Sequence, residues 1–201
     1  MRFTSALALL LAAGTVGAPA PVAAQASPSA VVLRDGPGGV WAFSDSGSGY
    51  QPAVQPEADV LRARVTHGRY AVSVRLTFDD LRRTHTQWYY CDLHTAGATA
   101  RFILEALDGR WRGALFQDVE GEWVRVPGTS HRIDYASDVV TMRFARRLVG
   151  ESPWVRVRLR NELGLGDGVF VTDNPTTDEP VAAYTPRIPV AAVTAGGSSG
   201  R

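Results

Sequence analysis

Polar and apolar residues alternate along most of this chain, and this period of two constrains its fold more than any other feature. One clear run places aromatic and aliphatic residues at every second position, at Tyr70, Val72, Val74, Leu76 and Phe78. A period of two sends successive side chains to opposite faces of an extended strand, whereas a helix needs a period near 3.6. No window keeps a helical period beyond a turn or two, so the pattern predicts an all-β fold.

Turn residues separate the alternating runs. Asp108 and Gly109 lie between predicted strands at 98–107 and 110–119, and Asp-Gly is a strong hairpin signal. His67 and Gly68 separate the runs at 61–66 and 70–78 in the same way. Short strands with turn signals every ~8–12 residues are typical of sandwiches and barrels. The size and the mostly one-sided burial favour a two-sheet antiparallel β-sandwich of jelly-roll-like type.

The two ends of the chain differ from this pattern. Residues 1–26 combine an early Arg2, an apolar run at 6–13 and a small-x-small site at 24–26, which predicts a secretory signal peptide. The apolar run is shorter than the ~20 residues of a membrane span. We expect a secreted, extracellular protein with no transmembrane segment, whose sandwich domain covers 27–172. Residues 173–201 predict a flexible segment with room for one edge strand.

Composition excludes several classes of protein. Hydrophobic residues make up 45% and charged residues 20% of the 201 residues, which indicates one globular domain. Basic residues number 21, all of them Arg, against 20 acidic residues, so we expect no nucleic acid partner. Cys91 is the only cysteine, so no internal disulfide can form. Its place among inward-facing residues predicts a buried, unreactive thiol rather than a nucleophile.

One predicted strand carries the best candidate for a ligand-binding face. If Tyr89, Cys91 and Leu93 face inward, the other four side chains share the outer face, namely Trp88, Tyr90, Asp92 and His94. Such residues lie about 6.6–7 Å apart along a strand. Aromatic rings there could stack on a sugar while the polar groups bind its hydroxyls. The alternatives are that the opposite register is buried, or that a loop covers this face.

Acidic residues suggest two further sites. Asp35, Asp45 and Asp59 end loops in the first third, and Asp35 with Asp59 are the candidate calcium ligands, because Ca²⁺ prefers loop carboxylates and carbonyls. Ordinary turn chemistry explains the same residues. A second group, Glu105, Asp118 and Glu120, surrounds one hairpin and could act as a glycoside hydrolase pair. Solvated hairpin charges are the favoured interpretation, and no nucleophile elbow, zinc-protease helix or nucleotide motif occurs.

The first half of the chain has a recognisable order of residues. Asp35 and Gly36 precede Val40 and Trp41, a loop then ends at Asp59 and Val60, and a strand from Tyr70 ends at Asp79. This order resembles family-9 carbohydrate-binding-module-like and DOMON-like β-sandwiches, and the whole chain resembles small secreted bacterial sandwich proteins of unassigned activity. The resemblance implies a two-sheet sandwich, an extracellular location, non-catalytic ligand binding and structural calcium. Haem binding needs axial ligands such as Met and His, and Met142 is predicted to lie in the core.

These observations together predict a secreted, non-catalytic binding module for carbohydrate or a cell-envelope surface. A secreted domain that docks another protein or serves a structural role is the first alternative. A glycoside-hydrolase-like enzyme is the second. No catalytic residue is assigned under the leading prediction.

Overall fold

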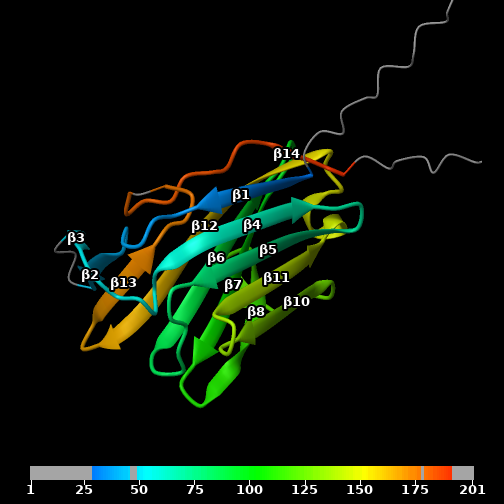
Figure 1. Ribbon diagram of the computed structural model, residues 1–201. Helices are drawn as coiled ribbons and strands as arrows, with labels where there is room; N and C mark the ends of the chain where they lie inside the picture. Colours follow the sequence, from blue (N-terminus) through cyan, green and yellow to red (C-terminus); the bar gives the residue numbers. More distant parts are fainter. Residues whose placement is uncertain (1–28, 46–48, 178, 192–201) are drawn as a thin grey trace, which may run out of the picture.

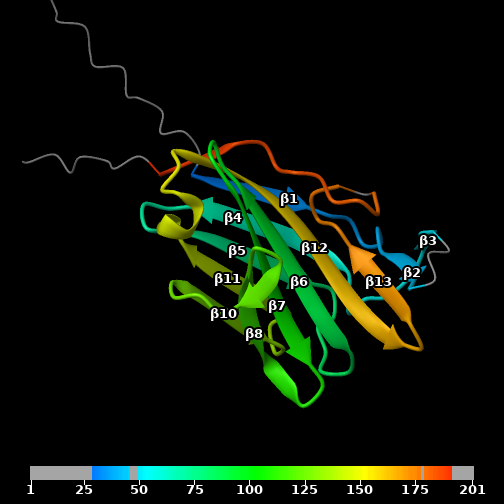
Figure 2. The same cartoon turned by 180° about the vertical axis from the view of Figure 1, so that it is seen from behind.

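The computed structural model describes residues 29–45, 49–177 and 179–191, and it is a sandwich of two antiparallel sheets. Figure 1 views it from the side of the smaller sheet, and Figure 2 from the side of the larger one. This confirms the all-β, two-sheet prediction. The predicted signal peptide at 1–26 and the last residues, 192–201, lie outside the described residues.

The smaller sheet has five strands, in the order β1 (Ala30–Arg34), β4 (Val60–His67), β5 (Ala71–Phe78), β11 (Val139–Ala145) and β10 (Thr129–Asp134). The path of the larger sheet runs through β3 (Gln51–Pro52), β2 (Trp41–Ser44), β13 (Val169–Asp173), β12 (Trp154–Gly166), β6 (Thr86–His94), β7 (Thr99–Leu107), β8 (Arg110–Val119) and β9 (Glu122–Val124). A short strand, β14 (Ile188–Pro189), pairs with β12. Among the described residues, the only helical element is a 3₁₀ turn, η1 (Arg146–Val149).

The alternating residues of the two sheets form the core between them. Tyr89, Cys91 and Leu93 of β6 are fully buried, as are Val72 and Val74 of β5. Each such aliphatic or aromatic side chain contributes roughly 1.5–3 kcal/mol by leaving water. Because a shift of one residue would turn the whole set outward, this burial fixes the register of each strand. The outer face of β6 is therefore the face that the alternation predicted.

The segment after β13 returns along β12 and is held there by hydrogen bonds. The backbone N–H of Thr185 donates to the carbonyl of Val157 over 2.8 Å, and the Thr185 hydroxyl accepts from the Val157 N–H over 2.9 Å. Figure 2 shows this segment in orange to red. It places Tyr184 over the outer face of the larger sheet, where its ring contacts His94 and the guanidinium groups of Arg156 and Arg158. In the described ranges, no helix is long and apolar enough to span a bilayer.

Candidate functional site

The outer face of the larger sheet carries charged and aromatic side chains in cross-strand rows. In one row, Arg158 of β12 lies opposite Asp92 of β6, which lies opposite Arg101 of β7. In the next row, Arg160 lies opposite Tyr90. Residues that face each other across neighbouring strands are about 4.5–5.5 Å apart at Cβ, so each row brings its side chains into contact.

A groove of about 310 Å³ lies over these rows, and we call it the outer groove. Its lining includes three aromatic residues and three cations, namely Tyr50, Tyr90, Trp123, Arg101, Arg158 and Arg160. Residues 180–182 of the returning C-terminal segment form one wall. Tyr50 and Trp123 are each 43% exposed, so their rings are accessible to a ligand. The groove therefore combines flat apolar surfaces with hydrogen-bond donors.

Two of the three cations of the outer groove are paired with acids, one on the neighbouring strand and one on the same strand. The Arg158 guanidinium binds the Asp92 carboxylate, with Nε donating over 2.9 Å. Arg160 pairs with Glu162 at 3.1 Å and lies 4.2 Å above the Tyr90 ring. Burial, reinforced by the neighbouring Glu162 charge, raises the pKa of Tyr90 to about 12. The Tyr90 phenol therefore stays protonated and neutral in ordinary conditions.

Two of the four predicted binding residues line the outer groove, and two do not. Tyr90 and Asp92 line it. Trp88 packs instead against Phe170 and Gly164, where a Cβ on Gly164 would lie 3.3 Å from the indole. His94 accepts or donates a 3.0 Å hydrogen bond with Thr99 and contacts the Trp154 ring. The outward register therefore did not by itself identify which side chains share a cavity.

The remaining groove residues come from elements far apart in the chain. Tyr50 precedes β3, Trp123 belongs to β9, and Arg158 belongs to β12. Trp123 is an exposed aromatic beside a tight turn, which is the only signal that sequence reasoning had for it. Tyr50 and the three arginines carry no local pattern that distinguishes them from ordinary surface residues.

The residues considered for covalent or acid–base catalysis do not come together in one catalytic site. Burial raises the pKa of the Cys91 thiol, and the side chain is fully buried, so it is not a nucleophile. Phe102 lies opposite Gln117, which places Glu105 four residues along the strands from Asp118. That offset is about 13 Å, beyond the 5–10 Å of glycosidase carboxylate pairs. Asp118 accepts a 2.8 Å hydrogen bond from Gly121 within its own turn, and Glu120 is exposed there.

Three aspartates meet at the other end of the larger sheet. Asp59 accepts from the Gly38 N–H at 2.9 Å, and Asp173 accepts from the Val60 N–H at 2.6 Å. A Cβ on Gly39 would lie 3.7 Å from Asp35 Oδ1 and 3.9 Å from Asp173 Oδ1. Asp35 and Asp59, predicted as calcium ligands, therefore lie near a third carboxylate that the sequence did not single out. Asp45 lies at a different turn, hydrogen-bonded through its N–H to Gly168.

Two observations about this aspartate cluster bear on calcium, and they point in different directions. Asp59 Oδ1 and Asp173 Oδ1 are buried without a hydrogen-bond partner, which suits a cation. However, the described residues contain no group of three or more His, Cys, Asp or Glu side chains arranged to hold a metal ion. Burial, with the charges of Asp35 and Asp59, raises the pKa of Asp173 to about 8. Protonation of Asp173 thus relieves the crowding of charge without a metal, and calcium stays a prediction.

Comparison with known proteins gives no further guidance on the site. No protein-family model, curated protein or solved structure matches this chain.

Proposed function

We propose that this protein is a non-catalytic carbohydrate-binding module that uses the outer groove. The observation that carries this proposal is the convergence of Tyr50, Tyr90 and Trp123 from separate elements into one open groove with guanidinium donors. Aromatic rings present flat apolar faces to the C–H side of a sugar, and the guanidinium groups donate to hydroxyls and ring oxygens. This division of roles is common in sites for small polar ligands.

Two features support binding rather than turnover. Glu105 and Asp118, which lie on paired strands, are too far apart in register to act as an acid and base pair. Asp92, the acid of the outer groove, is engaged by Arg158 and has only 13% of its side chain exposed. We further propose that the chain is exported, on the basis of the signal-peptide pattern at 1–26, so that its ligand is an extracellular or cell-envelope glycan.

Binding of neutral oligosaccharides tests the proposal. A glycan array identifies a ligand, and calorimetry then compares the parent chain with Trp123→Ala, which is expected to weaken binding about tenfold through loss of one stacking ring, on the order of 1.4 kcal/mol. Tyr70→Ala is the matched control, because Tyr70 is 71% exposed and lies outside the groove. Equal affinity of the two variants, or no neutral glycan bound by the parent chain, would contradict the proposal.

Docking of another protein remains the second candidate. The β8–β9 hairpin exposes three apolar side chains, Val119, Trp123 and Val124, at 42%, 43% and 39%. Exposed apolar groups of this kind are frequent at protein interfaces. Val119→Ser with Val124→Ser separates the candidates, because these changes leave the stacking rings in place. Undiminished glycan binding by this double variant supports the carbohydrate proposal, whereas loss of a protein partner with no glycan response supports docking.

A further inference from the structure

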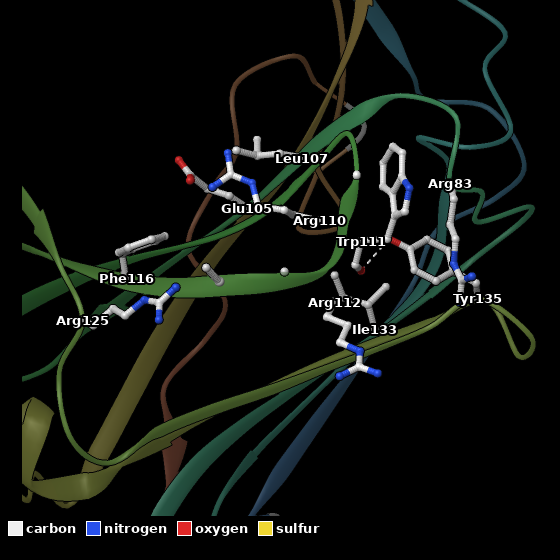
Figure 3. Close-up of a pocket in the computed structure, with 13 residues that line it drawn as sticks. Arg83, Glu105, Leu107, Arg110, Trp111, Arg112, Phe116, Arg125, Ile133 and Tyr135 are labelled. Atoms are coloured by element: carbon white, nitrogen blue, oxygen red, sulfur yellow. Dashed lines mark hydrogen bonds between the residues drawn. The ribbon is translucent and has the colours of Figure 1, made fainter.

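A second cavity, of about 660 Å³, lies at one open side of the sandwich, where β8 of the larger sheet meets β10 of the smaller one. We call it the edge cavity. Figure 3 shows Trp111, Tyr135 and Arg83 at one end of it, and Phe116 with Arg125 at the other. Its volume falls within the usual range of ~300–1,000 Å³ for ligand sites.

The backbone of β8 explains why a cavity forms here. Before Gln117, β8 pairs with β7 but has no strand on its other side in the described chain. Side chains of β10 and of the residue after it cap this edge instead. His131 Nε2 of β10 donates to the Arg112 carbonyl over 3.1 Å, and the hydroxyl of Tyr135, which follows β10, donates to the Trp111 carbonyl over 3.0 Å. The two sheets are thus bridged by side chains rather than by a strand, which leaves space between them.

A glycine and a bulge shape the floor of the edge cavity. Gly113 has a φ of +77°, and the pairing of β7 with β8 shifts register between Glu105 and Leu107. A Cβ on Gly113 would lie 2.9 Å from a Leu104 methyl and 3.0 Å from an Ile133 methyl. Only glycine fits both this backbone conformation and this close approach.

The edge cavity carries more arginines than acids in its lining. Its charged lining consists of four arginines and one acid, namely Arg83, Arg110, Arg112, Arg125 and Glu105. In the residues that the structure describes, ion pairs involve other arginines, and none includes these four. Arg83 and Arg125 lie over the Tyr135 and Phe116 rings, at 4.8 and 5.5 Å. Such stacking orients a guanidinium and leaves N–H donors free for a ligand.

From this combination we propose that the edge cavity binds an acidic carbohydrate, meaning a sugar that bears a carboxylate, sulfate or phosphate group. Guanidinium groups bind each of these anions through paired hydrogen bonds. The rings of Trp111, Phe116 and Tyr135 supply surfaces for the sugar itself. The whole chain carries a formal charge of only +1, so the excess of arginine in this cavity is a local feature and not a property of the whole chain. A ligand with a few localised anionic groups fits this local excess better than a long polyphosphate.

The opposite face of the molecule provides an internal control. Arg62, Arg64 and Arg75 lie together on the outside of the smaller sheet, over a hollow of only about 90 Å³ that has no aromatic lining. Substitutions there change the same amount of charge without touching the edge cavity. The proposal therefore predicts different results for equal changes of charge at the two places.

Calorimetry with the full chain tests the proposal, with oligogalacturonate, a sulfated chondroitin oligosaccharide and a mannose-6-phosphate oligosaccharide as probes. We expect at least one probe to bind, with affinity that falls as salt rises. Arg110→Ser with Arg112→Ser should weaken it at least tenfold, and Trp111→Ala several-fold, whereas Arg62→Ser with Arg64→Ser should leave it unchanged. Arg110 and Arg112 are exposed, so their replacement should not prevent folding, which thermal unfolding verifies.

Several outcomes would overturn the proposal. These are binding of none of the three probes, equal weakening by the cavity and control variants, or equal affinity for inorganic sulfate, which would indicate an anion site without sugar recognition. Tighter binding of a deoxythymidine oligonucleotide through the same arginines would indicate nucleic acid instead. The outer groove is tested separately, because neutral glycans should respond to Trp123→Ala and not to the Arg110 and Arg112 changes.

Discussion

The outer groove and the edge cavity are both lined by arginine and aromatic side chains, but they differ in how the arginine charge is used. In the groove, Arg158 and Arg160 bind Asp92 and Glu162 on the same face of the sheet. In the edge cavity, Arg110 and Arg112 form no ion pair with any residue that the structure describes, although Glu105 lies in the same lining. Most of the arginine charge in the groove is therefore paired, whereas the edge cavity has four arginines and one acid in its lining.

Strand register accounts for the pairing of Arg158, whereas Arg160 pairs with Glu162 along its own strand. Asp92 lies directly opposite Arg158, so that pair forms within the sheet. Arg110 and Arg112 lie on the part of β8 that has no hydrogen-bonded strand on its free edge in the described chain, where it meets side chains from β10 instead. A guanidinium with an acid at the opposite position on the next strand forms an ion pair within the sheet. One without such an acid is available to a ligand, and the two arrangements suit neutral and acidic sugars respectively.

The aspartate cluster extends this comparison from basic to acidic side chains. It should give the largest change in the free energy of unfolding. Asp173 has a pKa raised from 3.8 to about 8 by burial and by its acidic neighbours, so between these pH values the folded state holds a proton that the unfolded chain releases. The contribution of Asp173 to the free energy of unfolding should therefore be greatest below about pH 4 and fall by a few kcal/mol as pH rises to about 8, since each pKa unit corresponds to ~1.4 kcal/mol. Urea denaturation across pH measures this.

Asp173→Asn removes the titrating group and keeps an oxygen for the Val60 N–H, so the pH dependence should become flatter over this interval. A variant as steep as the parent chain would show that Asp173 does not titrate there. Calcium added at pH 8.5 then decides between protonation and metal binding. The calcium prediction requires a higher unfolding temperature with Ca²⁺ than with Mg²⁺, and no difference would contradict it.

Filling the floor of the edge cavity should abolish acidic-sugar binding there and so remove the difference between the two sites. Gly113→Ala places a Cβ against Leu104 and Ile133 at a positive φ, so we expect a loss of about 2–3 kcal/mol in unfolding free energy and of acidic-sugar binding. Gly109→Ala is the control, because Gly109 also has a positive φ, +69°, but has nothing within 4 Å of its Cβ position. It should cost only about 1 kcal/mol. Equal losses, measured by chemical denaturation, would mean that strain rather than crowding dominates.

Trp88 tests whether the outer face is uniform. Its indole packs on Phe170 and Gly164 outside the outer groove, so Trp88→Ala should lower the unfolding free energy by about 2 kcal/mol while leaving neutral-glycan affinity unchanged. Trp123→Ala should instead weaken neutral-glycan binding while leaving the unfolding free energy nearly unchanged. A tenfold loss of glycan affinity in folded Trp88→Ala would extend the binding site along β6.

The smallest effect is expected when the outer groove is made to resemble the edge cavity. Asp92→Asn leaves Arg158 without its acid, which should cost about 1 kcal/mol of stability because the pair is only partly exposed. The freed guanidinium should raise the affinity of the groove for oligogalacturonate several-fold, measured by calorimetry in the Arg110→Ser, Arg112→Ser background. Unchanged affinity would mean that pairing does not control which anions these sites accept.

Local chemistry explains which features the sequence could predict. The Asp108–Gly109 hairpin depends on two adjacent residues, and the inward register of Tyr89, Cys91 and Leu93 depends on a period of two. Tyr90 and Asp92 were placed on the outer face by the same periodicity. Trp88 and His94 share that face but contact other neighbours, because periodicity assigns a face and not a cavity.

The amino-acid sequence by itself determined the fold class, the inward-facing residues of the strands and the buried position of the thiol, because alternation and turn chemistry act between residues close in the chain. Only the tertiary structure decided that Tyr50, Trp123 and Arg158 share a groove, that Asp173 joins Asp35, and that Arg110 and Arg112 share a cavity with two further arginines. Those neighbours are set by the order of strands in each sheet. That order depends on contacts between segments that lie far apart in the chain, such as the hydrogen bond of the Asn161 side chain to the Ala58 carbonyl, 103 residues away, which no local pattern encodes.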